Sequence, residues 1–269
     1  MEIVHTISAL NVLLSPFKKE KSKVALVPTM GALHKGHLSL IEIAKQQAEI
    51  VVCSIFVNPT QFTDPKDLER YPRPLAHDIK MLEDAGCNIV FMPTVKEMYP
   101  LFPNSENWHI DLGPAEFLLE GEFRKGHYQG VTQIVKKLLD AVAPEIAFFG
   151  QKDFQQVLMI KNMVKFFNLD VEIISCPIIR EDDGLAMSSR NINLSASDRK
   201  NALVLSKALK IILVSTMTLI TDLFFLVCFA KGHYLINRAL FFFHQPVLTS
   251  FVNLSTSDCL AFDLEVASL

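Results

Sequence analysis

Five short apolar runs recur in the first two thirds of the chain, and a stretch with helical periodicity separates each run from the next. The runs lie at 23–29, 49–57, 87–93, 145–150 and 171–179, and they lack the polar alternation of a strand with one face in water. A strand that is apolar on both faces is typical of a parallel sheet covered by helices on both sides. Helical spacing of apolar residues appears at 36–48, 75–86, 130–144 and 154–168. The alternation predicts an α/β fold with a doubly wound, Rossmann-like parallel sheet.

The first residues and the overall composition narrow the class of protein. Apolar residues at Ile3, Ile7, Leu10 and Leu14 predict an amphipathic helix, and Glu2 stands where a signal peptide would carry lysines. The formal charge of −3 and the pI near 6.2 give no basic footprint for nucleic acid. Five cysteines without CxxC spacing favour a reduced compartment over disulfides or a zinc site. We therefore expect a cytoplasmic protein.

Four polar loops follow the predicted strands. They read PTMGALHKGH (28–37), NPTQF (58–62), FGQKDFQQ (149–156) and REDDGLAMSSRN (180–191). Ligands of doubly wound folds bind beyond the carboxyl ends of the strands. Because parallel strands end at one edge of the sheet, we expect these loops to converge there.

The first of these loops leaves a strand and opens a helix. Gly31 and Gly36 would let the backbone approach a ligand closely, and the helix N-terminus favours an anion. His34 and His37 could donate hydrogen bonds to phosphate oxygens. Two alternatives stay open: a metal site, for which no third ligand lies nearby in the sequence, and two surface histidines at a helix start.

The other loops strengthen the phosphate interpretation. Lys152 offers a point charge for phosphate, and Asp153 could hold a ribose hydroxyl or Mg²⁺. Ser188, Ser189 and Arg190 form a donor-rich set, and the amides of Asn58 and Gln61 suit a small polar molecule. Each of these short patterns also fits ordinary turn or helix-cap chemistry when it is taken alone.

Six motifs in register resemble the pantothenate synthetase (pantoate–β-alanine ligase) family. They are PTMGALHKGHLSL, SIFVNPTQF, DLERYPR, EGEFRKGHYQGV, FGQKDFQQ and REDDGLAMSSRN. The resemblance covers about residues 1–208. It places HKGH (34–37) at the HIGH-type motif and MSSR (187–190) at the KMSKS-type motif of the nucleotidyltransferase superfamily. One departure is Lys125, where the family usually has proline.

The resemblance implies a role for each matching residue. His34, His37 and Lys152 would act on the phosphates, with His37 as the proton donor. Gln61 would bind pantoate and lie near the β-alanine site, with Asn58 beside it, and Gln156 would contact pantoate. The ATP site would comprise Met30, Gly31, Ala32, Leu33, His34, Lys35, Gly36, His37, Gly150, Gln151, Lys152, Asp153, Ile179, Met187, Ser188, Ser189 and Arg190. No resident metal site is expected.

The family's activity is the ATP-dependent condensation of pantoate with β-alanine. It proceeds through a pantoyl adenylate with Mg²⁺ and gives pantothenate, AMP and diphosphate. The resemblance also implies a homodimer. It divides the chain into a Rossmann-like ATP- and pantoate-binding domain at 1–185 and a C-terminal lid region at 186–269.

The C-terminal tail departs from this pattern after about residue 210. The chain has 26 basic and 29 acidic residues, yet only eight of these 55 follow residue 200, together with eight of the 20 phenylalanines. Residues 211–230 could be a membrane helix, which Asp222 at its centre disfavours, or a buried helix of an unusual lid. A third interpretation, which we favour, is a shifted reading frame or retained non-coding sequence. A lid that cannot close would leave a catalytically impaired or non-catalytic nucleotide-binding remnant.

Overall fold

The computed structural model describes residues 1–104, 107–208 and 210–211, and its chain divides into two compact units. The first unit comprises Met1–Ile179 together with Met187–Ser189. The second includes Arg180–Ala186 and, among the described residues, 190–208 and 210–211. The expected domain boundary after residue 185 stays a prediction.

The first unit contains a parallel sheet of six strands. Their order is β1-β4-β3-β2-β5-β6, and each pair of neighbouring strands is parallel. The strands are β1 (Glu2–Val4), β2 (Val24–Thr29), β3 (Ile50–Ile55), β4 (Ile89–Phe91), β5 (Ile146–Gly150) and β6 (Glu172–Cys176). The predicted doubly wound α/β sheet is confirmed. The strand order reverses between β2 and β5, which makes this pair the topological switch point.

The beginning of the chain differs from its prediction. Glu2–Val4 form β1 and pair with β4, so that Ile3 lies opposite Val90, and helix α1 (Ile7–Lys19) begins only after the Thr6 cap. The helical spacing of Ile3 with Ile7 was therefore coincidental. Three residues are enough for an edge strand, and so short a strand leaves no periodicity to read.

The strands are apolar on both faces because two separate cores lie against the sheet. In β2, Val24 and Leu26 join the core with α1, α7 and α8, whereas Ala25 and Val27 join the core with α2 and α4. All four are 0% exposed. The alternation follows from the two-residue period of a strand, and it explains why the sequence shows continuous apolar runs.

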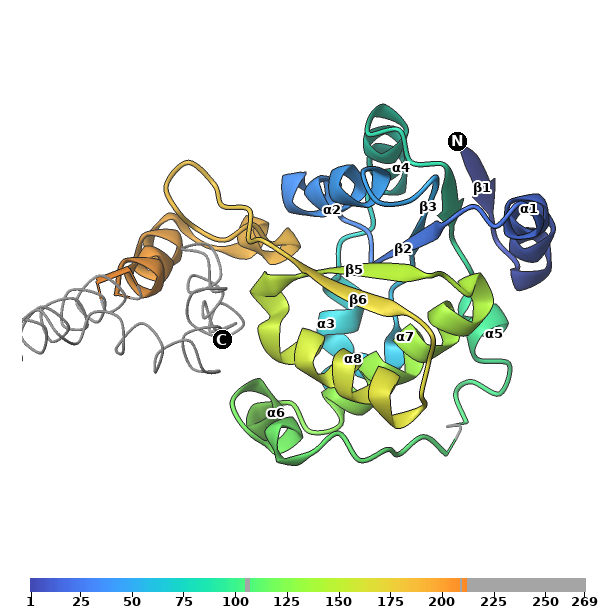
Figure 1. Ribbon diagram of the computed structural model, residues 1–269. Coiled ribbons are helices and arrows are strands. Elements are labelled where there is room, and N and C mark those ends of the chain that lie inside the picture. The colour runs from blue at the N-terminus through green and yellow to red at the C-terminus, as the bar shows by residue number, and fades with distance from the viewer. Residues whose placement is uncertain (105–106, 209, 212–269) are drawn as a thin grey trace, which may run out of the picture. The chain divides into compact units, whose positions relative to one another are not determined.

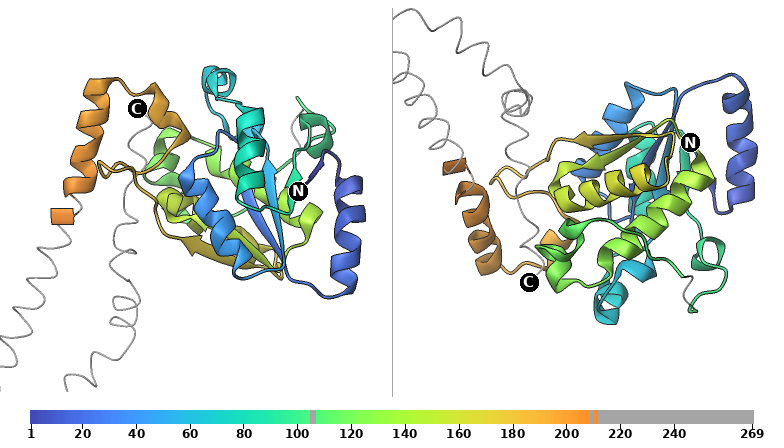
Figure 2. Two further views of the ribbon diagram at one scale, coloured as in Figure 1. Left: turned by 90° about the horizontal axis from the view of Figure 1, so that it is seen from above. Right: turned by 60° about the horizontal axis from the view of Figure 1, so that its bottom comes forward.

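Helices cover both faces of this sheet, with α2 and α4 on one side and α7 and α8 on the other (Figure 1, Figure 2). The four predicted helices are present as α2 (Lys35–Lys45), α4 (Leu75–Asp84), α7 (His127–Val142) and α8 (Phe154–Phe166). Three short helices were not predicted: α3 (Pro65–Arg70), α5 (Val95–Met98) and α6 (Glu120–Phe123).

The second unit is described only in part. An antiparallel bridge joins Arg180 to Ala186, residues 196–208 are helical, and Arg199 forms ion pairs of 2.8 Å with Glu181 and Asp183. The three interpretations of the tail concern residues that lie outside the described part of the chain. No helix among the described residues is long and apolar enough to cross a membrane.

Helix α1 offers a direct test of the first core. Leu14 is 0% exposed, whereas Val12 on the same helix is 71% exposed. We expect Leu14→Ala to lower the free energy of unfolding by about 2–5 kcal/mol, because it removes apolar burial and leaves a cavity. Val12→Ala should change it by less than about 0.5 kcal/mol. Urea unfolding followed by circular dichroism measures both, and equal effects would contradict the packing described for α1.

Candidate active site

Two of the polar loops leave adjacent strands at the switch point. The loop containing Met30–His34 follows β2, and the short helix η3 (Gln151–Asp153) follows β5, which pairs directly with β2. Both strands run in the same direction, so the two loops emerge at the same edge of the sheet. The sequence-based expectation that these loops converge is met by the strand order itself.

The β2 loop has a left-handed backbone that a buried carboxylate holds in place. Gly31 and Ala32 have φ of 81° and 50°. Asp78 of α4, which is 1% exposed, accepts the N–H of Ala32 at Oδ2 and that of Leu33 at Oδ1, both at 2.8 Å. A side chain on Gly31 would meet Asp78 Oδ2 at 3.0 Å. Asp78 therefore fixes the path of the loop toward the two histidines.

Sequence reasoning missed Asp78, although a signal was present. The residue lies four positions before Leu82, which is 0% exposed, so Asp78 falls on the apolar face of its own helix. A carboxylate on a buried helix face needs partners, because an unpaired buried charge is costly. The missing information was the identity of those partners, which lie about 45 residues earlier in the chain.

The two histidines contact each other at the start of α2. Their ring centroids are 4.0 Å apart, and the backbone N–H of His34 donates to Nδ1 of His37 at 3.2 Å. Burial and the neighbouring His34 ring lower the pKa of His37 to about 3. The His37 ring is therefore neutral near pH 7. Because its Nδ1 accepts a hydrogen bond, its proton resides on Nε2, which makes Nε2–H a donor for a ligand.

The β5 loop supplies the cation of this edge. Lys152 Nζ lies 2.9 Å from Asp153 Oδ1, and the side chains of the two residues are 28% and 37% exposed. The positive charge of Lys152 is thus held at the amino end of α8 and remains accessible to a ligand. Asp153 also acts on His37, because its negative charge opposes the lowering of the pKa of that ring.

The segment Met187–Ser189 reaches the β2 loop within the first unit. Ser189 Oγ donates to the carbonyl of Ala32 at 2.9 Å, and the N–H of Met187 donates to the carbonyl of Ile179 at 3.0 Å. The segment MSSR (187–190) therefore contacts the loop that leads into HKGH (34–37), although about 150 residues separate the two motifs in the sequence. Arg190 belongs to the second unit, so its predicted contact with phosphate stays a prediction.

The predicted amide pair differs in its remaining hydrogen-bonding capacity. Asn58 is 1% exposed; its amide N–H groups donate to Gln61 Oε1 and to the carbonyl of Gly130, each at 3.1 Å. Its Oδ1 accepts from Tyr99 and Thr60. A direct contact between Asn58 and substrate, which stays a prediction, would require one of these bonds to break.

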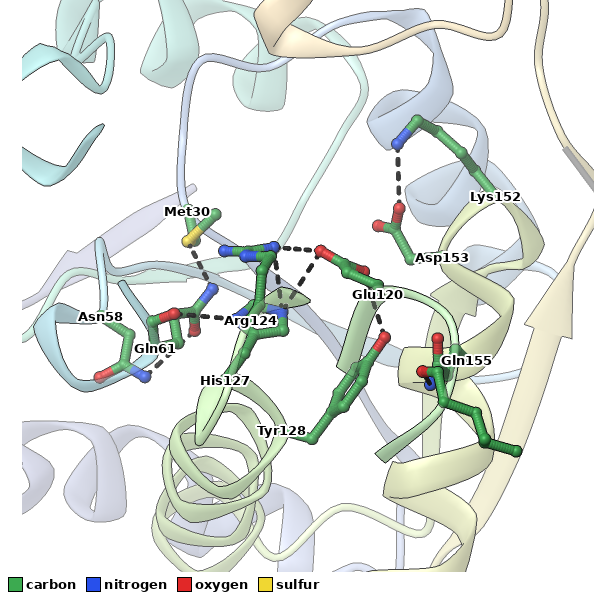
Figure 3. A network of polar contacts seen from close by, with 11 residues as sticks. Met30, Asn58, Gln61, Glu120, Arg124, His127, Tyr128, Lys152, Asp153 and Gln155 are labelled. Atoms are coloured by element: carbon green, nitrogen blue, oxygen red, sulfur yellow. Dashed lines mark hydrogen bonds and ion pairs between the residues drawn. The ribbon is translucent and has the colours of Figure 1, made fainter. Parts of the chain in front are cut away.

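Gln61 has capacity that Asn58 lacks. Its Nε2 donates to Met30 Sδ at 3.2 Å and its Oε1 accepts from Asn58, so one N–H and one lone pair have no partner among the described residues (Figure 3). The backbone of Gln61 packs closely on α7, where a side chain on Gly130 would lie 2.7 Å from Gln61 Cα. Gln61 is therefore the better placed of the two amides to bind a polar ligand.

A charged group from the motif EGEFRKGHYQGV, for which no role was predicted, lies beside Gln61. Arg124 Nη1 pairs with Glu120 Oε1 and lies 3.3 Å from His127 Nε2. His127 Nδ1 lies 2.8 Å from the carbonyl of Gln61, and Tyr128 donates to Glu120 Oε2 at 3.1 Å (Figure 3). These contacts join Glu120, Arg124, His127 and Tyr128 into one connected group.

The two glutamines after Asp153 have different positions. Gln155 Nε2 donates to the carbonyls of Ala115 and Leu118, both at 2.7 Å, and so holds the segment before α6. Gln156 is half-buried in the first turn of α8. Its predicted contact with substrate stays a prediction, as do the predicted nucleotide contacts of Ile179, Lys35 and Gly150.

Comparisons with known proteins give one consistent family. A family model described as pantoate-beta-alanine ligase matches residues 2–222, which includes the first residues of the tail that the sequence analysis set apart. A pantothenate synthetase from Bacteroides fragilis is 50% identical over 209 residues, which cover 78% of this chain and 73% of that protein. Another from Acetivibrio thermocellus is 51% identical over the same shares of the two chains.

Solved structures agree with the sequence relatives. A pantothenate synthetase from Thermus thermophilus has a TM-score of 0.71 and 44% identity, covering 78% of this chain and 73% of that one. A pantoate-beta-alanine ligase from Francisella tularensis, complexed with β,γ ATP and β-alanine, has a TM-score of 0.70 and 40% identity. That match covers 76% of this chain and 77% of the other.

The Asp78 contacts lead to a first prediction for this site. Asp78→Asn replaces one acceptor oxygen by an N–H₂ group that faces a backbone N–H. We expect it to lower the free energy of unfolding by about 1–3 kcal/mol and to weaken ATP binding by about 10-fold or more. The control Asp84→Asn lies on the same helix with a side chain that is 62% exposed. Urea unfolding and calorimetric titration with ATP measure both, and equal behaviour of the two variants would contradict the anchoring role.

The neutral state of His37 gives a second prediction. Its pKa is lowered to about 3 in the folded protein, whereas an unfolded histidine has a pKa near 6.5. The unfolded state therefore binds more protons between these values, so the free energy of unfolding falls as the pH drops below about 6.5.

We expect His37→Gln to remove part of this slope, by about 1–2 kcal/mol between pH 7 and pH 5. Urea unfolding of both proteins at the two pH values gives the difference. The pKa of His127 is also lowered, chiefly by burial, so some of the slope should remain in the variant. An unchanged slope would show that the His37 ring is not held neutral by the fold.

Proposed function

The chain belongs to the pantoate–beta-alanine ligase family and is a ligase, and on that premise we propose that it joins pantoate to β-alanine through a pantoyl adenylate. The reaction would consume ATP and release AMP, diphosphate and pantothenate. The observation that carries this proposal is the hydrogen bond of Ser189 to the carbonyl of Ala32, in the loop that leads to His34 and His37 and leaves the sheet next to the β5 loop with Lys152. This contact gathers donors and a cation for phosphate at the switch point.

The first half-reaction needs charge stabilisation more than a protein nucleophile. The carboxylate of pantoate attacks the α-phosphorus of ATP, and diphosphate leaves. His37 Nε2–H and Lys152 would stabilise the negative charge that develops on the phosphate oxygens, because fixed donors require little reorganisation during the reaction. The backbone of the β2 loop, held by Asp78, would keep these donors in position.

The described cysteines fit a mechanism without a covalent enzyme intermediate. Cys53, Cys87 and Cys176 are all buried. Burial raises the pKa of Cys53 well above its usual value and raises the pKa of Cys87 and that of Cys176 to about 11. These three thiols are therefore protonated and shielded, which is the opposite of an activated nucleophile. The substrates themselves supply both nucleophiles.

The second half-reaction would take place beside Gln61. The amine of β-alanine attacks the acyl carbon of the adenylate, AMP leaves with the electron pair of the broken bond, and the amine loses a proton. Gln61 would orient the pantoyl group with its remaining N–H and lone pair, and Asn58 would hold Gln61. Positioning of this kind accounts for a large part of the rate when two bound substrates react.

Asp153 is a suitable residue for Mg²⁺ that arrives with ATP. Mg²⁺ is usually held by one or two carboxylates together with substrate phosphates, and Asp153 presents a part-exposed carboxylate beside Lys152. The ion would neutralise phosphate charge. No cluster of three or more potential metal ligands occurs among the described residues. We also propose a cytoplasmic homodimer, as is typical of the family.

Removal of a phosphate-side donor should affect adenylate formation. We expect His37→Ala and Lys152→Ala to slow pantoate-dependent exchange of ³²P between diphosphate and ATP by about 30- to 1,000-fold, which corresponds to about 2–4 kcal/mol of barrier. Lys80→Ala is the control, because its side chain is 66% exposed on α4.

The same assay separates the ligase from the alternative that the tail leaves a non-catalytic remnant. Exchange by the wild-type chain that requires pantoate supports the ligase. A wild-type chain that binds ATP without exchange would contradict the proposed function, and near-wild-type exchange by both alanine variants would contradict the roles of His37 and Lys152.

A further inference from the structure

We propose that Arg124 binds the carboxylate of the amino-acid substrate and so selects a carboxylate-bearing amine. The inference rests on the proposed function. It concerns the second half-reaction only.

The chemistry of the second substrate requires a cation. β-Alanine must present an uncharged amine to the adenylate, and its other end then carries an unbalanced negative charge. A carboxylate taken from water into a protein site without a partner is strongly disfavoured. Arginine is well suited to this task, because its planar fork can bind both oxygens of a carboxylate at once.

Arg124 is linked to Gln61 through a single imidazole ring. His127 Nδ1 lies 2.8 Å from the carbonyl of Gln61, which can only accept, so Nδ1 carries the proton. His127 Nε2 then accepts from Arg124 Nη1 at 3.3 Å. Burial and the charge of Arg124 lower the pKa of His127, which agrees with a neutral ring in this tautomer. The guanidinium thus lies close to the proposed acyl-transfer site (Figure 3).

The guanidinium retains the edge that binds carboxylates. The side-chain contacts of Arg124 with Glu120 and with His127 both use Nη1. Nε and Nη2 form the side-on pair of donors for a carboxylate, and neither has a partner among the described residues. The Arg124 side chain is 19% exposed, so it is largely shielded from water without being fully buried.

The surrounding residues keep the guanidinium rigid before substrate binds. Glu120 is itself fixed by the Tyr128 hydroxyl, and its side chain is 10% exposed. Lys152, a second cation near this site, is paired with Asp153 and lies beside the loops assigned to phosphate. The two cations are thus suited to separate tasks: Lys152 for the nucleotide and Arg124 for the amino acid.

The test compares β-alanine with 3-aminopropan-1-ol, an amine of the same chain length that lacks the carboxylate. The variant Arg124→Gln removes the charge but keeps N–H groups for Glu120 and His127. The control Lys125→Gln removes the same charge from the exposed neighbouring position. Two rates are measured for each protein: pantoate-dependent ATP–diphosphate exchange, and AMP release as a function of amine concentration.

We expect Arg124→Gln to retain exchange within about 3-fold and to raise the KM for β-alanine by about 10- to 100-fold, as loss of a charge-assisted hydrogen-bonding pair predicts. The rate of Arg124→Gln with 3-aminopropan-1-ol should match that of wild type. The preference for β-alanine over 3-aminopropan-1-ol, which wild type should show, should disappear in this variant. Arg124→Lys, which restores a charge without the fork, should recover part of the preference. Lys125→Gln should behave as wild type in both assays.

The possible failures are distinguishable. If Arg124→Gln retains exchange and its KM for β-alanine is unchanged, Arg124 is a structural link and the proposal is wrong. If both Arg124 variants fold, as judged by circular dichroism, but lose exchange, the residue acts in the first half-reaction and the proposal is equally wrong. Absence of exchange in the wild-type chain would instead refute the proposed function on which this inference rests.

Discussion

The two hydrogen bonds from the β2 loop to Asp78 are the constraint on which the rest of the site depends. Without an acceptor on α4, the N–H groups of Ala32 and Leu33 would be buried and unpaired, and the left-handed backbone at Gly31 and Ala32 would have nothing to hold it. The same loop presents His34 and His37, and the carbonyl of Ala32 receives Ser189. One buried carboxylate therefore organises contacts from three distant parts of the chain.

The two neutral histidines show how local hydrogen bonds set the role of a side chain. His37 accepts at Nδ1 from a backbone N–H, which leaves its Nε2–H as a donor. His127 donates at Nδ1 to a backbone carbonyl, which turns its Nε2 into an acceptor for Arg124. Burial lowers the pKa of both rings. One tautomer suits contact with phosphate, and the other holds a cation beside Gln61.

The sequence predicted the sheet well because each central strand contacts two apolar cores. It misplaced the start of α1, because the three-residue strand β1 has no period of its own. The motifs singled out His34, His37 and Lys152, which lie in loops at the switch point, but Asp78 and Arg124 were missed because their meaning depends on partners in other elements. Asp78 looks like any helical aspartate until Ala32 and Leu33 are placed against it. The interpretations of the tail stay predictions, since residues 212–269 lie outside the described part of the chain.

The central claim is that this edge of the sheet directs the carboxylate of one substrate to the α-phosphorus of ATP. Pantoate labelled with ¹⁸O in its carboxylate tests that claim most directly, with the products of complete turnover examined by ³¹P NMR and mass spectrometry. Attack at the α-phosphorus, followed by amide formation, must leave one ¹⁸O atom in AMP and none in diphosphate. Label in inorganic phosphate, or unlabelled AMP alongside pantothenate, would contradict the account.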